Sequence, residues 1–131
     1  LRAGTDLTIV AWSRMTHVSM RAADELAKQN VSAEVIDLRT IYPWDRAAVL
    51  ASVEKTGRLL VVQESVLAGG FANEIAAEVA QQLHWQLKAP PARLGAPRIP
   101  VGYAPALEAE HRVEVGQIVK EGLRVAKASR S

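Results

Sequence analysis

Four short runs rich in apolar and β-branched residues alternate with segments of helical periodicity, and this alternation constrains the fold more than any other feature of the sequence. Such alternation is typical of βαβ units, in which right-handed crossovers bring parallel strands together. We therefore expect an α/β fold of three layers, α/β/α, with a mainly parallel sheet of four strands. The expected strands are Leu7–Trp12, Ala33–Leu38, Arg58–Gln63 and Ala92–Gly95, the third being central because it is almost continuously apolar.

The segments between these runs carry apolar residues three and four positions apart, as one face of a helix requires. We expect Ser13 or Thr16 to cap the first helix, Asp45 to cap the second, and Gly57 to end the second. A last helix is expected over Val113–Lys127. The third helix has an apolar stripe that consists of Phe71, Ile75, Val79 and Leu83.

The expected strand order is 2-1-3-4, which places a reversal of winding between the first and third strands. Open α/β sheets bind ligands in the crevice beside such a reversal, at the carboxyl ends of the strands. The loops that would form this crevice are Ser13–His17 and Glu64–Gly70. Any site for a small molecule or a partner is expected there.

Length and composition place the chain among globular single domains. It has 131 residues, a net charge of +2 and no cysteine, which excludes disulfides and thiolate catalysis. The sequence has neither the aromatic basic face of a nucleic-acid binder nor an apolar run long enough for a membrane span, so we expect neither partner. No two histidines have metal-ligand spacing, so no metal site is expected. The chain opens on Leu1, and we interpret this as a start inside a longer polypeptide.

Few residues on the crevice loops could carry chemistry. His17 and Thr16 lie at the start of the first helix, where the dipole favours a neutral imidazole that could act as a base, with Glu64 as the natural partner. A histidine bonded to loop backbone or to another chain is the simpler alternative. Gly69 and Gly70 open the third helix, whose free N–H groups could hold an anion, although a structural turn that lets the helix pack closely on the sheet explains them better.

Several longer motifs go beyond fold class. They are Glu34–Asp45 (EVIDLRTIYPWD), Ser52–Leu60 (SVEKTGRLL), Gly69–Ile75 (GGFANEI) and Pro100–Glu108 (PVGYAPALE). In combination they closely resemble the C-terminal domain of 2-oxo acid dehydrogenase β subunits. The PWD and GGFA forms are most similar to those of the branched-chain (2-oxoisovalerate) type.

The resemblance implies a transketolase-type C-terminal domain, whose family fold adds an antiparallel edge strand that would precede Gly4 and is expected to be missing here. It implies an α2β2 enzyme whose thiamin diphosphate and Mg²⁺ bind outside this chain. The implied partners are an α subunit, a second β subunit and the dihydrolipoamide acyltransferase core. No catalytic or cofactor-binding residue is therefore expected in this chain, and the isolated chain is expected to be inactive. The expected interface residues are Trp44, Asp45, Phe71 and Tyr103.

One departure and three alternatives accompany this resemblance. The third strand ends in Gln63-Glu64, where some relatives have a histidine before the glutamate. The alternatives are the same domain from a pyruvate or acetoin dehydrogenase, the same domain from another transketolase-family thiamin enzyme, and a free-standing interaction module. Among sugar-phosphate enzymes, Arg14 and His17 would be the candidates for binding phosphate. We expect a bacterial cytoplasmic setting rather than the mitochondrial matrix.

Overall fold

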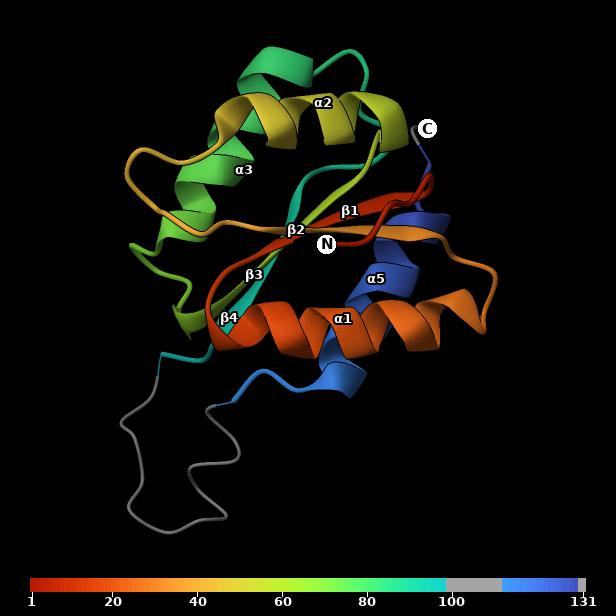
Figure 1. Cartoon of the computed structure of the whole chain (residues 1–131). Coiled ribbons are helices and arrows are strands. Elements are labelled where there is room, and N and C mark those ends of the chain that lie inside the picture. Colours follow the sequence, from red (N-terminus) through yellow and green to blue (C-terminus); the bar gives the residue numbers. More distant parts are fainter. Residues whose placement is uncertain (99–111, 130–131) are drawn as a thin grey trace, which may run out of the picture.

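The computed structural model describes residues 1–98 and 112–129, which form a parallel sheet with helices on both faces (Figure 1). The sheet has four strands in the order β2-β1-β3-β4, as the sequence predicts. All three strand pairings are parallel. The elements are β1 (Leu7–Ala11), α1 (Arg14–Ala27), β2 (Ala33–Asp37), α2 (Arg46–Thr56), β3 (Leu59–Val66), α3 (Phe71–Leu83), β4 (Ala92–Ala96) and α5 (Val115–Lys127).

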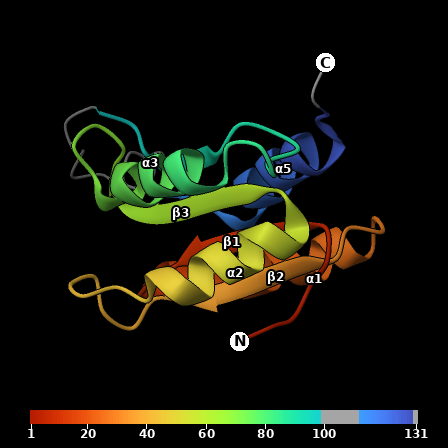
Figure 2. The same cartoon turned by 90° about the horizontal axis from the view of Figure 1, so that it is seen from above.

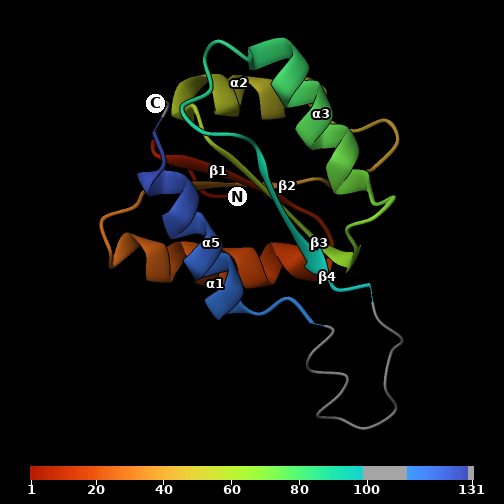
Figure 3. The same ribbon diagram turned by 180° about the vertical axis from the view of Figure 1, so that it is seen from behind.

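The helices divide into two layers, with α1 and α5 on one face of the sheet and α2 and α3 on the other (Figures 1 and 3). Figure 2 looks down on the face that carries α2 and α3. Successive strand residues point to opposite faces, so β1 and β3 contribute side chains to two cores. Ile9 and Val62 belong to the core beside α1 and α5, whereas Val10 and Val61 belong to the core beside α2 and α3. The central β3 is therefore buried on both faces, as its apolar sequence predicts.

Two element boundaries differ from the sequence prediction by more than one residue. Strand β3 continues past Gln63 to Val66, with an irregularity in its pairing to β4 between Val62 and Val66. The polar residues after Val62 suggested an end, but Gln63 is fully buried and hydrogen-bonded. The last helix begins at Val115 rather than at residue 113, because Glu114 forms a capping box with residue 117.

The predicted helix ends are confirmed for α2 and wrong at the start of α1. Asp45 caps α2 by accepting a hydrogen bond from the Ala48 N–H at 3.0 Å, and Gly57 ends it with φ of 71°. Ser13 occupies the N-cap position of α1 but makes no capping hydrogen bond with its side chain. Thr16 lies within α1, where its hydroxyl donates to Asp37 Oδ1 at 3.0 Å. Neither residue therefore caps α1.

The outer edge of β2 carries a single antiparallel bridge between Arg2 and Val35. The Val35 N–H donates to the Arg2 carbonyl at 2.9 Å. Antiparallel pairing before Gly4, where the family resemblance places an edge strand, is thus present as one bridge. Gly4 permits this approach, because a Cβ there would lie 2.2 Å from the Glu34 nitrogen.

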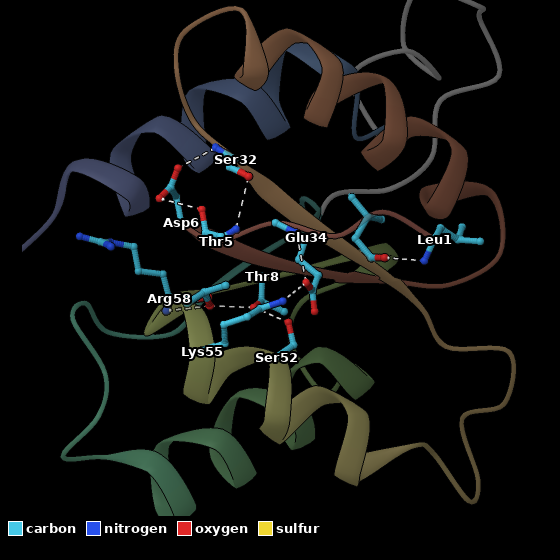
Figure 4. A network of polar contacts seen from close by, with 12 residues as sticks. Leu1, Thr5, Asp6, Thr8, Ser32, Glu34, Ser52, Lys55 and Arg58 are labelled. Atoms are coloured by element: carbon cyan, nitrogen blue, oxygen red, sulfur yellow. Dashed lines mark hydrogen bonds and ion pairs between the residues drawn. The ribbon is translucent and has the colours of Figure 1, made fainter.

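A polar network joins α2 to β1 and β2 near the amino ends of these strands (Figure 4). The Thr8 hydroxyl is fully buried and lies 2.8 Å from the hydroxyls of both Ser52 and Thr56. Beside them, Glu34 forms an ion pair with Lys55. Burial opposes ionisation of Glu34, but hydrogen bonds from Lys55, from Ser52 and from the backbone N–H of residue 4 outweigh it and lower the pKa of the carboxyl. The network stabilises the fold at the edge opposite the crevice.

Candidate functional site

Two adjacent hollows occupy the carboxyl edge of the sheet, where the sequence predicts the crevice. The first has a volume of about 870 Å³ and lies at the ends of β1 and β2; we call it the β1–β2 hollow. The second, of about 730 Å³, lies between the loop before α2 and the start of α3; we call it the aromatic hollow. The side chains used below are Trp12, Arg14, Thr16, His17, Asp37, Arg39 and Ile41 in the β1–β2 hollow, and Tyr42, Trp44, Gly69, Gly70 and Phe71 in the aromatic hollow.

Asp37 is the fixed carboxylate of the β1–β2 hollow. It lies at the end of β2, accepts the hydrogen bond from the buried Thr16 hydroxyl, and has its Oδ2 3.4 Å from Arg39 Nε. The ion pair between Asp37 and Arg39 is the local pair that their spacing on the strand end suggests. Thr16 thus fixes the Asp37 carboxylate by a hydrogen bond, whereas His17 lines the hollow as an exposed residue.

The predicted partnership between His17 and Glu64 is wrong. Glu64 instead lies beside Arg14, with Arg14 Nη1 3.8 Å from Glu64 Oε1. The other terminal nitrogen, Arg14 Nη2, lies 3.8 Å from an oxygen of Glu114, the N-cap residue of α5. Arg14 therefore spans from α1 to the end of β3 and to the start of α5, a position that no local sequence pattern reveals.

Three aromatic rings connect the two hollows. The Phe71 ring is 5.8 Å from that of Trp12 and 6.2 Å from that of Trp44, with interplanar angles of 74° and 84°. These are edge-to-face contacts, which are favourable for aromatic pairs. Two of the predicted interface residues, Trp44 and Phe71, thus come together with Gly69 and Gly70. All three rings are partly exposed.

The other two interface candidates have different outcomes. Asp45 is exposed beside the aromatic hollow, but its carboxylate is engaged as the cap of α2. Tyr103 lies outside the described residues. The cap explains Asp45 without a partner, so its predicted interface role has no independent support from the geometry.

Gln63 shapes the aromatic hollow, although the sequence singles it out only as a departure from relatives. Its amide nitrogen donates to the carbonyls of Ser65 at 3.3 Å and Val66 at 2.7 Å, and its oxygen accepts from the Ala72 N–H at 2.8 Å. A Cβ at Gly70 would lie 2.0 Å from the Gln63 amide nitrogen. Gln63 therefore fixes the loop before α3, next to the Gly70 backbone that lines the aromatic hollow. In the sequence, the signal that could have indicated this role is a polar residue at an inward-facing strand position shortly before two glycines.

The described residues contain little that could perform catalysis by themselves. They include no group of three His, Cys, Asp or Glu side chains that could hold a metal ion. Within the same residues, no helix has the length and apolar character needed to cross a membrane. The carboxyl edge of the sheet has two cationic side chains at the β1–β2 hollow and partly exposed aromatic rings at the aromatic hollow. These groups are suited to binding and to subunit assembly.

Curated relatives are β subunits of larger enzymes. The pyruvate dehydrogenase E1 component subunit beta of Bacillus subtilis (strain 168) is 49% identical over 96 residues, covering 73% of this chain and 30% of the relative. The 2-oxoisovalerate dehydrogenase subunit beta of the same organism is 39% identical over 108 residues, covering 82% and 33%. The acetoin:2,6-dichlorophenolindophenol oxidoreductase subunit beta of Cupriavidus necator is 39% identical over 130 residues, covering 99% and 38%.

Fold and family comparisons agree with these relatives. A solved split-gene transketolase, an inactive β4 tetramer, superposes with a TM-score of 0.83 at 23% identity, covering 98% of this chain and 42% of that one. This likeness concerns the fold alone. The chain spans about a third of the length of the curated relatives. The profile described as "Transketolase, C-terminal domain" matches residues 1–118, and the chain therefore belongs to the transketolase C-terminal domain family, with β subunits of 2-oxo acid dehydrogenases among its homologues.

Proposed function

We propose that this chain is the C-terminal domain of the β subunit of a thiamin-diphosphate-dependent 2-oxo acid dehydrogenase of the branched-chain type. The whole enzyme would oxidatively decarboxylate a 2-oxo acid and transfer the acyl group to a lipoyl arm. The observation that carries this proposal is the identity of 49% with a pyruvate dehydrogenase β subunit and of 39% with a 2-oxoisovalerate dehydrogenase β subunit, each over most of the chain. The PWD and GGFA motifs support the branched-chain type.

Within that enzyme, we assign assembly to this domain. Trp44 and Phe71 are partly exposed at the aromatic hollow, and Tyr42 beside them is 94% exposed. Aromatic side chains that are exposed in one chain but grouped around a hollow are typical anchors of protein interfaces. We assign this hollow to contact with the α subunit or the second β subunit. The acyltransferase core is the further partner, and the bacterial cytoplasm is the proposed location.

Thiamin diphosphate and its Mg²⁺ are proposed to bind outside this chain. The described residues offer no cluster of metal ligands, and the start of α3 lacks the lysine and hydroxyl of a nucleotide-binding loop. The described residues therefore do not fit the cofactor. Their proposed contribution is to hold the neighbouring subunits in place.

The assembly role is tested on the full-length β subunit co-purified with its α subunit. Replacing Phe71 or Trp44 with alanine removes an anchor, so we expect the dissociation constant of the α2β2 assembly to rise at least tenfold. Trp85→Ala is the control, because Trp85 is 83% exposed and lies after α3, far from the hollow in the chain. Mass photometry measures the species. Unchanged assembly in both hollow variants would contradict the assignment.

The pyruvate type is the second candidate for the substrate, because the pyruvate dehydrogenase relative has the higher identity, 49%. The ratio of kcat/KM for 2-oxoisovalerate and pyruvate, measured on the assembled enzyme, distinguishes the two. Turnover of either acid by this chain alone with thiamin diphosphate would contradict both. A chain that assembles with no α subunit and supports no turnover would instead favour a free-standing interaction module.

A further inference from the structure

We propose that the β1–β2 hollow binds a compact dianion, a small molecule with two carboxylate or phosphate groups, between Arg14 and Arg39. The hollow holds about 870 Å³, and Arg14, His17 and Arg39 are among the residues that line it. Such a site goes beyond subunit assembly, because a contact between chains needs no small-molecule ligand. It lies on this chain alone and can be tested without the α subunit.

The first support is that neither guanidinium group is hydrogen-bonded within the described residues. Arg14 approaches two carboxylates at 3.8 Å, well beyond the 2.7–2.9 Å of a charge-assisted hydrogen bond. Arg39 faces Asp37 only through Nε, at 3.4 Å, and its side chain is 83% exposed. Most of the five donors of each guanidinium therefore remain available, in the fork geometry that matches carboxylate and phosphate oxygens.

Another arginine of this chain shows what a structural pair looks like. Arg124 donates to both oxygens of Glu121, at 3.0 and 2.6 Å, one turn apart on α5. Its guanidinium is thereby satisfied by a bidentate partner. Arg14 and Arg39 have no such partner in the described part of the chain, although carboxylates lie within reach. Their positions are those of side chains that can turn toward a ligand.

The residues that line the hollow carry more positive than negative charge, whereas Glu64 and Glu114 stand beside Arg14 outside that lining. Asp37 is the one acidic residue among those that line the hollow, and the Thr16 hydroxyl holds one of its oxygens. With two arginines against one aspartate, the lining has a formal charge of +1 when His17 is neutral. The start of α1 adds the positive end of a helix dipole, with no acidic residue in its first turn.

The shape of the hollow defines the class of ligand. Trp12 and Ile41 supply apolar wall beside the cations, so a short carbon skeleton can lie between the charged ends. Two separate guanidinium groups favour a ligand with two anionic groups over a monoanion. Dicarboxylates, tricarboxylates and phosphorylated metabolites share this chemistry.

The test is a titration of the chain, followed by backbone amide NMR, with citrate, with inorganic pyrophosphate and with sodium chloride at matched ionic strength. We expect shifts at Arg14, His17 and Arg39 that saturate with citrate or pyrophosphate and not with chloride. The preferred anion identifies the source as carboxylate or phosphate. Shifts that are spread over the surface, or equal for all three salts, would overturn the proposal.

Variants separate a site from general charge attraction. Arg39→Gln and Arg14→Gln each remove one guanidinium, and each is expected to weaken the dianion about tenfold, the value of a charge-assisted hydrogen bond. Arg21→Gln is the matched control, since Arg21 is exposed on α1 and does not line the hollow. Equal affinity in all three variants would refute the site. Urea unfolding of each variant tests whether the fold is intact. If Arg14→Gln is unstable, Arg39→Gln still decides the question, because Arg39 is exposed and its replacement should not affect stability.

Discussion

Replacing Gln63 with methionine removes three hydrogen bonds from the base of the aromatic hollow without emptying the space that the side chain fills. The Ala72 N–H loses its acceptor at 2.8 Å, and the carbonyls of Val66 and Ser65 lose their donor. Methionine has a similar length and flexibility, so the packing cost is small. The effect is therefore one of hydrogen bonding.

The magnitude follows from the burial of the three groups. Ala72 is fully buried, so its unpaired N–H costs about 1–3 kcal/mol. The carbonyls of Ser65 and Val66 belong to residues that are not buried, and water can reach part of their surface, so they add at most about 1 kcal/mol together. We expect a loss of about 2–3 kcal/mol in the free energy of unfolding, and a fall in Tm on the order of 10 °C.

Urea unfolding followed by circular dichroism measures this loss, and amide exchange locates it. Exchange of the Ala72 and Gly70 amides should accelerate, because Gln63 fixes the loop against the start of α3. Gln82→Met is the control, since Gln82 is exposed on the same helix and its replacement should change stability by less than about 0.5 kcal/mol. A Gln63→Met variant that is as stable as the control would refute the role of the buried amide.

Three further predictions concern the fold. Gly57→Ala should destabilise the fold by about 1–2 kcal/mol, because φ is 71° there and alanine rarely adopts such a backbone conformation. Gly116→Ala should stabilise the fold by about 0.5–1 kcal/mol, because this position on α5 has open space for a methyl group. Urea unfolding measures both changes. The lowered pKa of Glu34 means that its stabilising contribution is present above its ordinary value of 4.5 and is lost as pH falls through the lower folded value; Glu34→Gln should flatten this acid limb of stability against pH. Thr8→Val should cost about 1–3 kcal/mol in urea unfolding, because two buried hydroxyls lose their shared partner, and an unchanged midpoint would contradict this.

The sheet could be predicted because its determinants are local. Apolar runs such as Leu59–Val62 identify buried strands, and the handedness of the crossovers limits the order in which they pair. The cap at Asp45 and the stop at Gly57 are likewise single-residue signals with one geometric meaning. Each of these features depends on a residue and its immediate neighbours in the chain.

The site could be predicted only in position. That Thr16 would reach Asp37, and that Glu64 would face Arg14 rather than His17, depends on the rotation of α1 against the ends of two strands. A rotation of one residue, about 100°, exchanges which side chain faces the loop. The continuation of β3 past Gln63 could not be predicted for a related reason. In the sequence, a glutamine whose amide is buried with three hydrogen-bond partners looks the same as an exposed glutamine.

The amino edge of the sheet has the tightly packed polar contacts that stabilise the fold, and the carboxyl edge has the looser contacts to which we assign binding. At the amino edge, the buried hydroxyls of Thr8 and Ser52 lie 2.8 Å apart, and burial strengthens such contacts. At the carboxyl edge, Arg14 stands 3.8 Å from its carboxylates, and the aromatic rings are partly exposed. Donors without hydrogen bonds and exposed rings lower the stability of an isolated chain, so they persist where a partner or ligand compensates and where other parts of the fold supply the stability. The proposed partner and ligand would therefore account for the loose contacts at the carboxyl edge, and the tight contacts at the amino edge supply the stability that allows them.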